Sequence, residues 1–378
     1  MGTPTISIDF EPEYFVGDTI AISSNGLTGS VHWNSYGSGI FVETGTTVCD
    51  VPSPHMILTA GNNVIEATVT NDCGTGTSTK NIVAEPHYSG TWSEKATMSD
   101  TRCSAASFSI GTKAYVGGGN VGSAAGLADF WEWDQLSNTW SQRADMPVSR
   151  TECISFALNG KGYVGLGVGN SIFLDDLWEW DPASNSWTQK SNYPGGKRQG
   201  AAVFTIGSYA YIGTGDSLTG HYTRDFYRYD PATDTWLARA DFGAAGKVYA
   251  AAFAVNGKGY ICGGYTQTWS GSNDVWEYDP VADTWIQKTN FPKEIYAGTG
   301  FSINAKGYIT CPLNYTTGDR LSLSTYEYDP VTDVWQNKHG CPGGPRSGTN
   351  ACVIGNSAYI AGGHIADGFT GELWEFTP

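Results

Sequence analysis

The chain has 378 residues, which is enough for two domains, and only 15% of them are charged. Its net charge of −16 argues against nucleic acid or an anionic membrane surface as a partner. No apolar run approaches the roughly twenty residues that a membrane-spanning helix needs, so we predict no membrane insertion.

Residues 1–85 are predicted to form a small β-sandwich. Short alternating stretches recur there, with Gly, Asn and Asp between them: TISIDF, TIAISS, SVHWNS and VIEATVTN. Their number and length are typical of one immunoglobulin-like sandwich. The segments VHWNSYGSG (31–39) and NNVIEATVTNDCG (62–74) resemble PKD-type domains. Cys49 and Cys73 both lie in this predicted domain, and we propose them as a disulfide because a small domain gains most from a covalent link.

Residues 86–378 carry an internal repeat. Six tryptophans recur at intervals of 47 to 50 residues: Trp92, Trp140, Trp187, Trp236, Trp285 and Trp335. Five of them end near-copies of one phrase: WDQLSNTW, WDPASNSW, YDPATDTW, YDPVADTW and YDPVTDVW. A period near fifty residues with an aromatic-Asp-Pro turn is a signature of a propeller blade.

Each repeat unit is predicted to hold four strands. The first is small and apolar, as in AAVFTI (201–206), and the second contains a tyrosine and ends in glycine, as in KAYVGGG (113–119). The third resembles DFWEWD (129–134), and the fourth begins at the repeated tryptophan. Between the last two, Asp-Pro-x-Ser/Thr predicts a tight turn, because proline presets φ and the aspartate accepts backbone N–H groups.

The glycine pair after a tyrosine-containing strand and the YDPxTxxW turn resemble kelch repeats, the family that includes galactose oxidase. The resemblance covers residues 92–378 and implies a β-propeller. Kelch propellers serve as enzymes, substrate receptors and surface adhesins, so the resemblance does not select a function.

The order of the strands predicts how the ring closes. Trp92 opens a fourth strand that no third strand precedes, and the chain ends at LWEFTP, a third strand that no fourth strand follows. We therefore predict an all-β protein with a six-bladed propeller at 86–378, in which the strand at 92–97 completes the last blade and leaves no open edge.

Two sets of positions are predicted to lie on one face of the propeller. This face, here called the long-loop face, holds the loops between second and third strands and the loops between blades. Thirteen residues before the second-strand tyrosines stands a basic ring: Arg102, Arg150, Arg198, Lys247, Ile295 and Arg346. It either attracts an acidic ligand or ties neighbouring blades together. The acids Asp129, Asp176, Asp225, Asp274 and Glu372, just before each third strand, are predicted to be structural.

Five residues after the same tyrosines stands a layer that varies from blade to blade: Asn120, Val168, Asp216, Tyr265, Leu313 and His364. An asymmetric ligand requires such differences, although free drift of loop residues also produces them. The long loops add His221 and Trp269. Aromatic rings beside polar groups suit a sugar or a protein loop equally. The predicted ligand-binding residues are Asp216, Tyr265, His364, Asn120, Trp269, His221, Arg102, Arg150, Arg198 and Arg346.

Two enzyme readings accompany the resemblance. Copper oxidation would need two histidines and two tyrosines around the metal. The chain has six histidines and no Tyr-His pair that matches the family motif, so we predict no metal and no cofactor. A reaction like that of the six-bladed sialate mutarotases would pair an acid/base with an arginine, for example Arg150 with Glu152 or Arg198 with Asp216.

We predict a recognition module rather than an enzyme, secreted or displayed on the cell surface after removal of a signal peptide. Its partner would be a glycan or an extracellular protein, and the alternative is a structural component of a surface assembly. The chain has eight cysteines. Cys311 and Cys341 lie in two loops of the same predicted blade and face, and we propose them as a second disulfide.

Overall fold

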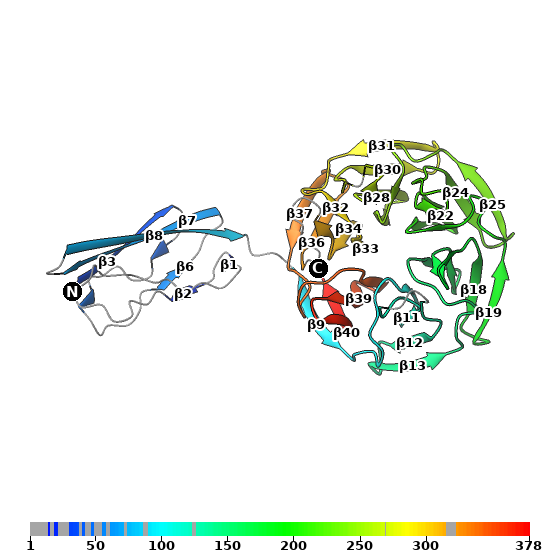
Figure 1. Ribbon diagram of the computed structural model, residues 1–378, viewed down its shortest axis with the longest axis horizontal. Helices are drawn as coiled ribbons and strands as arrows, with labels where there is room; N and C mark the ends of the chain where they lie inside the picture. The colour runs from blue at the N-terminus through cyan, green and yellow to red at the C-terminus, as the bar shows by residue number, and fades with distance from the viewer. Residues whose placement is uncertain are drawn as a thin grey trace. The chain divides into compact units, whose positions relative to one another are not determined.

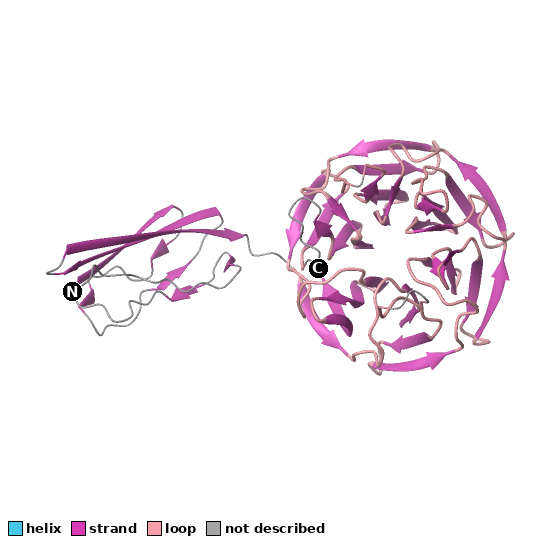
Figure 2. Ribbon diagram, in the orientation of Figure 1, coloured by secondary structure: helices cyan, strands magenta, loops and turns pink. Residues whose placement is uncertain are grey.

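The computed structural model describes residues 90–122, 126–268, 270–313 and 323–378 in full, and the backbone of residue 314 and of eight strands before residue 86. The chain divides into two compact units, Met1–Tyr88 and Ser89–Pro378. The described residues contain strands and loops but no helix, and accordingly no helix that could cross a membrane (Figure 2).

The first unit contains two sheets. The larger has the strand order β1-β8-β7-β3-β5 and the smaller the order β2-β6-β4. Their bounds are β1 Tyr14–Phe15, β2 Thr19–Ala21, β3 Ser30–Gly37, β4 Ile40–Phe41, β5 Thr47–Val48, β6 His55–Ile57, β7 Gly61–Asn71 and β8 Gly74–Glu85. The predicted stretches SVHWNS and VIEATVTN coincide with β3 and β7, whereas β8 was not predicted. The stretch TISIDF, Cys49 and Cys73 lie outside the described residues, and the PKD-type sandwich stays a prediction.

The second unit is a six-bladed propeller of four-stranded antiparallel sheets (Figure 1). Blade one is β10 Ala106–Ile110, β11 Lys113–Gly117, β12 Phe130–Asp134 and β13 Thr139–Arg143; blade two is β14 Ile154–Leu158, β15 Lys161–Gly165, β18 Leu177–Asp181 and β19 Ser186–Lys190; blade three is β21 Ala202–Ile206, β22 Tyr209–Gly213, β24 Phe226–Asp230 and β25 Thr235–Arg239. Blade four is β27 Ala251–Val255, β28 Lys258–Cys262, β30 Val275–Asp279 and β31 Thr284–Lys288; blade five is β33 Thr299–Ile303, β34 Lys306–Thr310, β36 Thr325–Asp329 and β37 Val334–Lys338; blade six is β38 Asn350–Ile354, β39 Ser357–Ile365, β40 Gly368–Thr377 and β9 Thr91–Lys95.

The predicted closure of the ring is confirmed. β9 pairs antiparallel with β40, and Trp92 stands opposite Phe376 (Figure 1). The ring of Trp92 lies 4.8 Å from that of Phe376. First strands of neighbouring blades contact one another all the way round. The first and last strands of the second unit thus share one blade.

Each repeated tryptophan links its blade to the preceding one. The indole Nε1 of all six donates a hydrogen bond of 2.7 to 3.3 Å to the first carbonyl after the fourth strand of that blade. The acceptors are Ala96, Ala144, Ser191, Ala240, Thr289 and His339. The predicted turns are also confirmed, since the aspartate before each accepts the N–H two residues on at 2.8 to 2.9 Å.

Replacing Trp236 with alanine should destabilise the propeller by about 3 to 5 kcal/mol, the usual cost of truncating a tryptophan that packs against the core. The indole donates to the Ser191 carbonyl at 3.0 Å and its ring lies 5.2 Å from that of Tyr193, both in blade two. Because blades contact mainly their neighbours, we expect the substitution to loosen blades two and three first, and amide hydrogen exchange should be fastest there. Leu237→Ala, next in sequence and 47% exposed, is the control and should change stability by less than about 0.5 kcal/mol. Uniform loosening of all blades would contradict this assignment.

Candidate functional site

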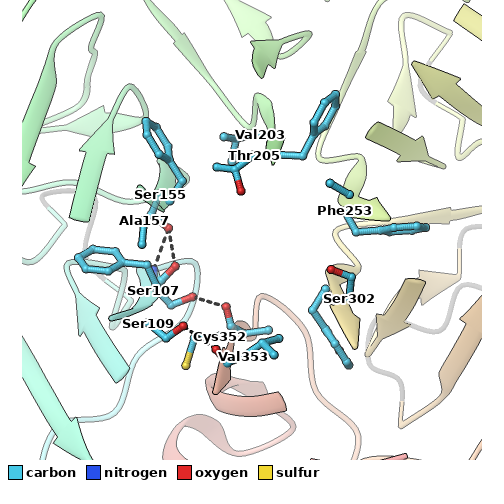
Figure 3. Close-up of a pocket in the computed structure, with 16 residues that line it drawn as sticks. Ser107, Ser109, Ser155, Ala157, Val203, Thr205, Phe253, Ser302, Cys352 and Val353 are labelled. Atoms are coloured by element: carbon cyan, nitrogen blue, oxygen red, sulfur yellow. Dashed lines mark hydrogen bonds between the residues drawn. The ribbon is translucent and has the colours of Figure 1, made fainter. Parts of the chain in front are cut away.

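The centre of the propeller is a channel lined by the first strands of the blades. Its cavity measures about 320 Å³. Figure 3 shows hydroxyl and small aliphatic side chains around the opening, with the ring of Phe253 directed away from it. Ser107 and Ser109 donate to the carbonyls of Ala351 and Val353, at 3.0 and 2.6 Å, and so link blades one and six. Small residues at the centre, as predicted, let the first strands approach closely.

The long-loop face is built by pairing of its two loop types. The residue after each basic-ring position pairs with a residue of the variable layer, which confirms that the two loop types share a face. The pairs are Cys103↔Asn120, Thr151↔Val168, Gln199↔Asp216, Val248↔Tyr265, Tyr296↔Leu313 and Ser347↔His364. Three of these pairs lie in two-stranded sheets: β20 Arg198–Gln199 with β23 Asp216–Ser217, β26 Lys247–Val248 with β29 Tyr265–Thr266, and β32 Ile295–Tyr296 with β35 Leu313–Asn314. In blade two, β16 Val168–Gly169 pairs with β17 Ile172–Phe173 within the loop between the second and third strands.

The end of the channel on this face is surrounded by a ring of backbone hydrogen bonds. Two residues before each first strand, the chain adopts a left-handed conformation, with φ between 52° and 61°, at Ser104, Glu152, Gly200, Tyr249, Ala297 and Gly348. Each of the first five donates its N–H to the carbonyl of the corresponding residue in the preceding blade, at 2.8 to 3.1 Å. We call these six residues the mouth ring. Four are not glycine, and a strained backbone of this kind is kept only where its surroundings enforce it.

Two side chains of the mouth ring meet across the blade between them. The hydroxyl of Tyr249 donates to Oε2 of Glu152 at 2.5 Å, linking blades four and two. Gly200 stands between them in the ring, and a Cβ there would lie only 2.7 Å from Cδ1 and Cε1 of Tyr249. Glycine at position 200 therefore leaves the space that the tyrosine ring crosses.

Asp216 adds a second carboxyl group beside this pair. Its Oδ2 accepts from Nε2 of Gln199 at 3.3 Å, while its buried Oδ1 has no hydrogen-bond partner among the described residues. Burial raises the pKa of Glu152, the Tyr249 hydrogen bond opposes that rise, and the charge of Asp216 adds to it. Burial likewise raises the pKa of Asp216. Burial and the two nearby acids also raise the pKa of the Tyr249 hydroxyl. We call Glu152, Tyr249, Asp216 and Gln199 the mouth cluster.

Of the predicted site residues, only Asp216 belongs to the mouth cluster. Tyr265 packs edge-on against Tyr296 with ring centroids 4.7 Å apart, and His364 does so against Phe369 at 5.2 Å. Oδ1 of Asn120 accepts the N–H of Gly122 at 2.5 Å. His221 is exposed, and its carbonyl accepts from Ser217. Trp269 lies outside the described residues.

Tyr249 and Gln199 were not among the residues predicted from the sequence. Tyr249 stands two residues after the basic-ring position, at a place where the six repeats differ from one another. That difference between repeats was the one sign in the sequence that position 249 could be functional. The sequence does not indicate the contact with Glu152, because the two residues are 97 positions apart.

The basic ring is buried and paired. Arg102, Arg150, Arg198, Lys247 and Arg346 are 0 or 1% exposed, and each forms an ion pair with the acid of its own blade: Asp129, Asp176, Asp225, Asp274 and Glu372. Nη1 of Arg150 also donates to the carbonyl of Leu166 at 3.1 Å, and its backbone N–H donates to Leu127 of blade one at 3.0 Å. Each of the four arginines predicted to bind ligand is thus buried and paired with an acid of its own blade.

Blade five departs from this arrangement at both positions. Ile295 replaces the base, and Ser324 stands where the other blades have the acid. Ile295 is 1% exposed. Because the base and the acid are both replaced, blade five has no uncompensated buried charge at this place. Replacing only one of them would leave the other buried without a partner.

The described residues contain no group of three or more His, Cys, Asp or Glu side chains placed to hold a metal ion. The expected lack of metal and cofactor stays a prediction.

Comparisons with known proteins agree with the architecture. The model of the KLHDC2/KLHL20/DRC7 kelch-repeats domain matches residues 45–240, and the model of the kelch motif matches residues 246–292. No curated protein matches the chain. Among solved structures it is similar to that of YjhT, with 17% identity and a TM-score of 0.63 over 74% of this chain and 95% of that one. At such identity the likeness concerns the fold alone.

Proposed function

Since this chain belongs to the KLHDC2/KLHL20/DRC7 kelch-repeats domain family, we propose that it is a recognition module that binds a glycan at the mouth cluster on its long-loop face. The observation that carries the proposal is the Glu152–Tyr249 hydrogen bond beside Asp216, at the end of the channel. Five blades share the ion pair between the basic-ring residue and an acid. In the mouth ring, large polar side chains occur only at Glu152 and Tyr249.

The chemistry of the cluster suits sugar hydroxyl groups. Two carboxyl groups, a phenol and an amide supply both donors and acceptors, and Oδ1 of Asp216 is a buried acceptor that a ligand hydroxyl would satisfy. Tyr249 adds an aromatic surface. Polar groups of this kind fix the orientation of a small ligand in a concave site.

The electrostatics favour a neutral or amine-bearing sugar over an acidic one. Glu152 and Asp216 face the ligand with carboxyl groups, whereas Arg150 and Arg198 are paired with Asp176 and Asp225. The acidic ligand that the basic ring suggested is therefore not part of the proposal. The net charge of −16 acts in the same direction.

We also propose that the protein is secreted or displayed on the cell surface, with residues 1–85 as a PKD-type sandwich that serves as a spacer. Low charge density and abundant glycine, 49 of 378 residues, support this reading of the composition. A sugar-acting enzyme is the second candidate function, because the raised pKa of Glu152 suits a general acid. A sialate mutarotase would need a free cation for the sugar carboxylate, and Arg150 and Arg198 are already paired.

A glycan array with the intact protein, followed by calorimetric titration of the glycans that bind, tests the proposal. We expect Glu152→Gln, Asp216→Asn and Tyr249→Phe each to weaken binding tenfold or more, since hydrogen bonds to charged groups contribute about 1.5 to 3 kcal/mol. Asp241→Asn, at an exposed carboxylate in the loop after β25, should leave affinity within about twofold. Binding that survives all three cluster substitutions would place the site elsewhere, and conversion of the bound sugar would establish the enzyme.

The Glu152→Gln variant should report on binding without loss of the fold. The pKa of Glu152 is raised in the folded state, so its favourable contribution is full below the unfolded pKa and is lost as pH rises through the folded pKa. Above that pKa the ionised carboxyl costs stability, and glutamine has no charge. We therefore expect this variant to melt no lower than the wild type at pH 8.

A further inference from the structure

Two cysteines stand where blade five lacks its ion pair. Cys311 is the first residue after β34, with φ of 50°, and the residue at this position is left-handed in every blade: Gly118, Leu166, Thr214, Gly263, Cys311 and Gly362. In blades one to three its carbonyl accepts a hydrogen bond from the basic-ring arginine. Cys311 is therefore equivalent to the residue whose carbonyl the arginine contacts in those blades, and Ile295 stands in place of the arginine itself.

Cys341 occupies a second equivalent position. It is the third residue after the fourth strand, where the other blades have a large side chain: Met98, Met146, Tyr193, Phe242 and Phe291. The two positions adjoin, since a Cβ on Gly118 would lie 2.7 Å from Cε of Met146. In blade five a pair of cysteines replaces this combination of a small or medium-sized residue and a large one.

The fold brings the two thiols into contact. The N–H groups of Cys311 and Cys341 donate to the carbonyls of two consecutive residues, Ser324 at 2.9 Å and Leu323 at 2.8 Å. Both side chains are buried, 0 and 1% exposed, and each thiol shifts the pKa of the other. Both are free thiols in this structure, so the disulfide proposed from the sequence is not formed here.

The surroundings make Cys311 the more nucleophilic of the two. Its sulfur lies 3.6 Å from Oγ1 of Thr310. In the part of the chain that the structure describes, the buried Nη1 of Arg346 has no hydrogen-bond partner, and the charge of that guanidinium acts on both thiols. A hydrogen bond with Cys341 lowers the pKa of Cys311 against the effect of burial, and Thr310 and Arg346 lower it further. The same hydrogen bond and burial raise the pKa of Cys341.

We propose that Cys311 and Cys341 are a modification site that closes as a disulfide and replaces, in blade five, the ion pair of the other blades. The oxidant is a small disulfide such as glutathione disulfide. The thiolate of Cys311 attacks one sulfur of the oxidant and releases one glutathione thiolate, which takes up a proton. Cys341 then loses its proton and attacks the Cys311 sulfur, and this step releases the second glutathione. Two protein thiols are oxidised and one glutathione disulfide is reduced.

The test compares fully reduced protein with protein treated with glutathione disulfide, both as the native fold and during refolding, where both thiols are accessible. We expect a peptide map without reductant to show Cys311 linked to Cys341, and dithiothreitol to separate them. On treatment with glutathione disulfide, the wild type should lose two more free thiols than the Cys311→Ser/Cys341→Ser double variant. Cys262→Ser, at a buried cysteine of blade four, should keep the link.

The oxidised protein should also melt about 5 °C or more above the reduced protein, because the link closes a loop of some thirty residues in the unfolded chain. The double variant should show no such difference. If the oxidised wild type yields no Cys311–Cys341 peptide in either arm, or links either cysteine to another one, the proposal is wrong. The result is independent of glycan binding, since the peptide map needs no ligand.

Discussion

A protein that lacks residues 1–98 should melt at least about 10 °C below the full chain, or fail to fold, because the deletion removes β9 from blade six. The loss includes five backbone pairs with β40, the contact of Trp92 with Phe376, and the Trp92 hydrogen bond to His339 at 2.9 Å. It also exposes the edge of β40 to pairing with other chains.

The matched control lacks residues 1–88, the first compact unit alone. It keeps β9, so its propeller should retain the melting temperature of the full chain within a few degrees. Differential scanning calorimetry of the two truncations beside the full chain separates the outcomes. Equal melting of the two truncated proteins would mean that β9 does not hold the ring closed.

Removing the guanidinium of Arg150 should also lower the stability of the propeller. Arg150→Ala should destabilise the propeller by about 3 to 5 kcal/mol, because it leaves the carboxylate of Asp176 buried without its partner. The pair is bidentate, with Nη1–Oδ1 and Nη2–Oδ2 distances of 2.9 and 2.8 Å. Burial alone would raise the pKa of Asp176, and the arginine outweighs burial and lowers it.

The size of this effect should depend on pH. Because the pKa of Asp176 is lowered in the folded state, the stability it contributes is present above the unfolded pKa and is lost as pH falls through the folded pKa. The difference between wild type and Arg150→Ala should therefore narrow on acidification. Urea unfolding at a series of pH values measures it, and a difference that stays constant into strong acid would argue against the ion pair as the cause.

Lysine should be a partial substitute at this position. Blade four already uses Lys247, whose Nζ contacts Oδ1 of Asp274 at 2.5 Å. Arg150→Lys loses the fork geometry and the bond to Leu166, so we expect a cost of about 1 to 2 kcal/mol. Lys197→Ala, at an exposed lysine, is the control and should change stability by less than about 0.5 kcal/mol.

Within the small unit, prediction from sequence was less complete than in the propeller. β8, Gly74–Glu85, was missed because its first eight residues, GTGTSTKN, have no alternation of apolar and polar residues. A strand of that composition forms because a neighbouring strand pairs with it. All of β7 pairs with β8. Pattern alone does not register such a strand.

In the propeller, the number of blades, the closing strand and the tight turns could all be predicted from the sequence. The repeated tryptophan occurs six times and the turn five times, and the turns depend on local chemistry such as the Asp134 carboxylate accepting the N–H of Leu136 at 2.8 Å. The tertiary structure alone decided which residues meet at the mouth. Glu152 and Tyr249 come from blades two and four, and their contact depends on the space that Gly200 leaves between them. It likewise decided that the basic ring is buried in ion pairs, since a charged residue at a loop position reads the same in sequence whether it faces solvent or an acid of its own blade.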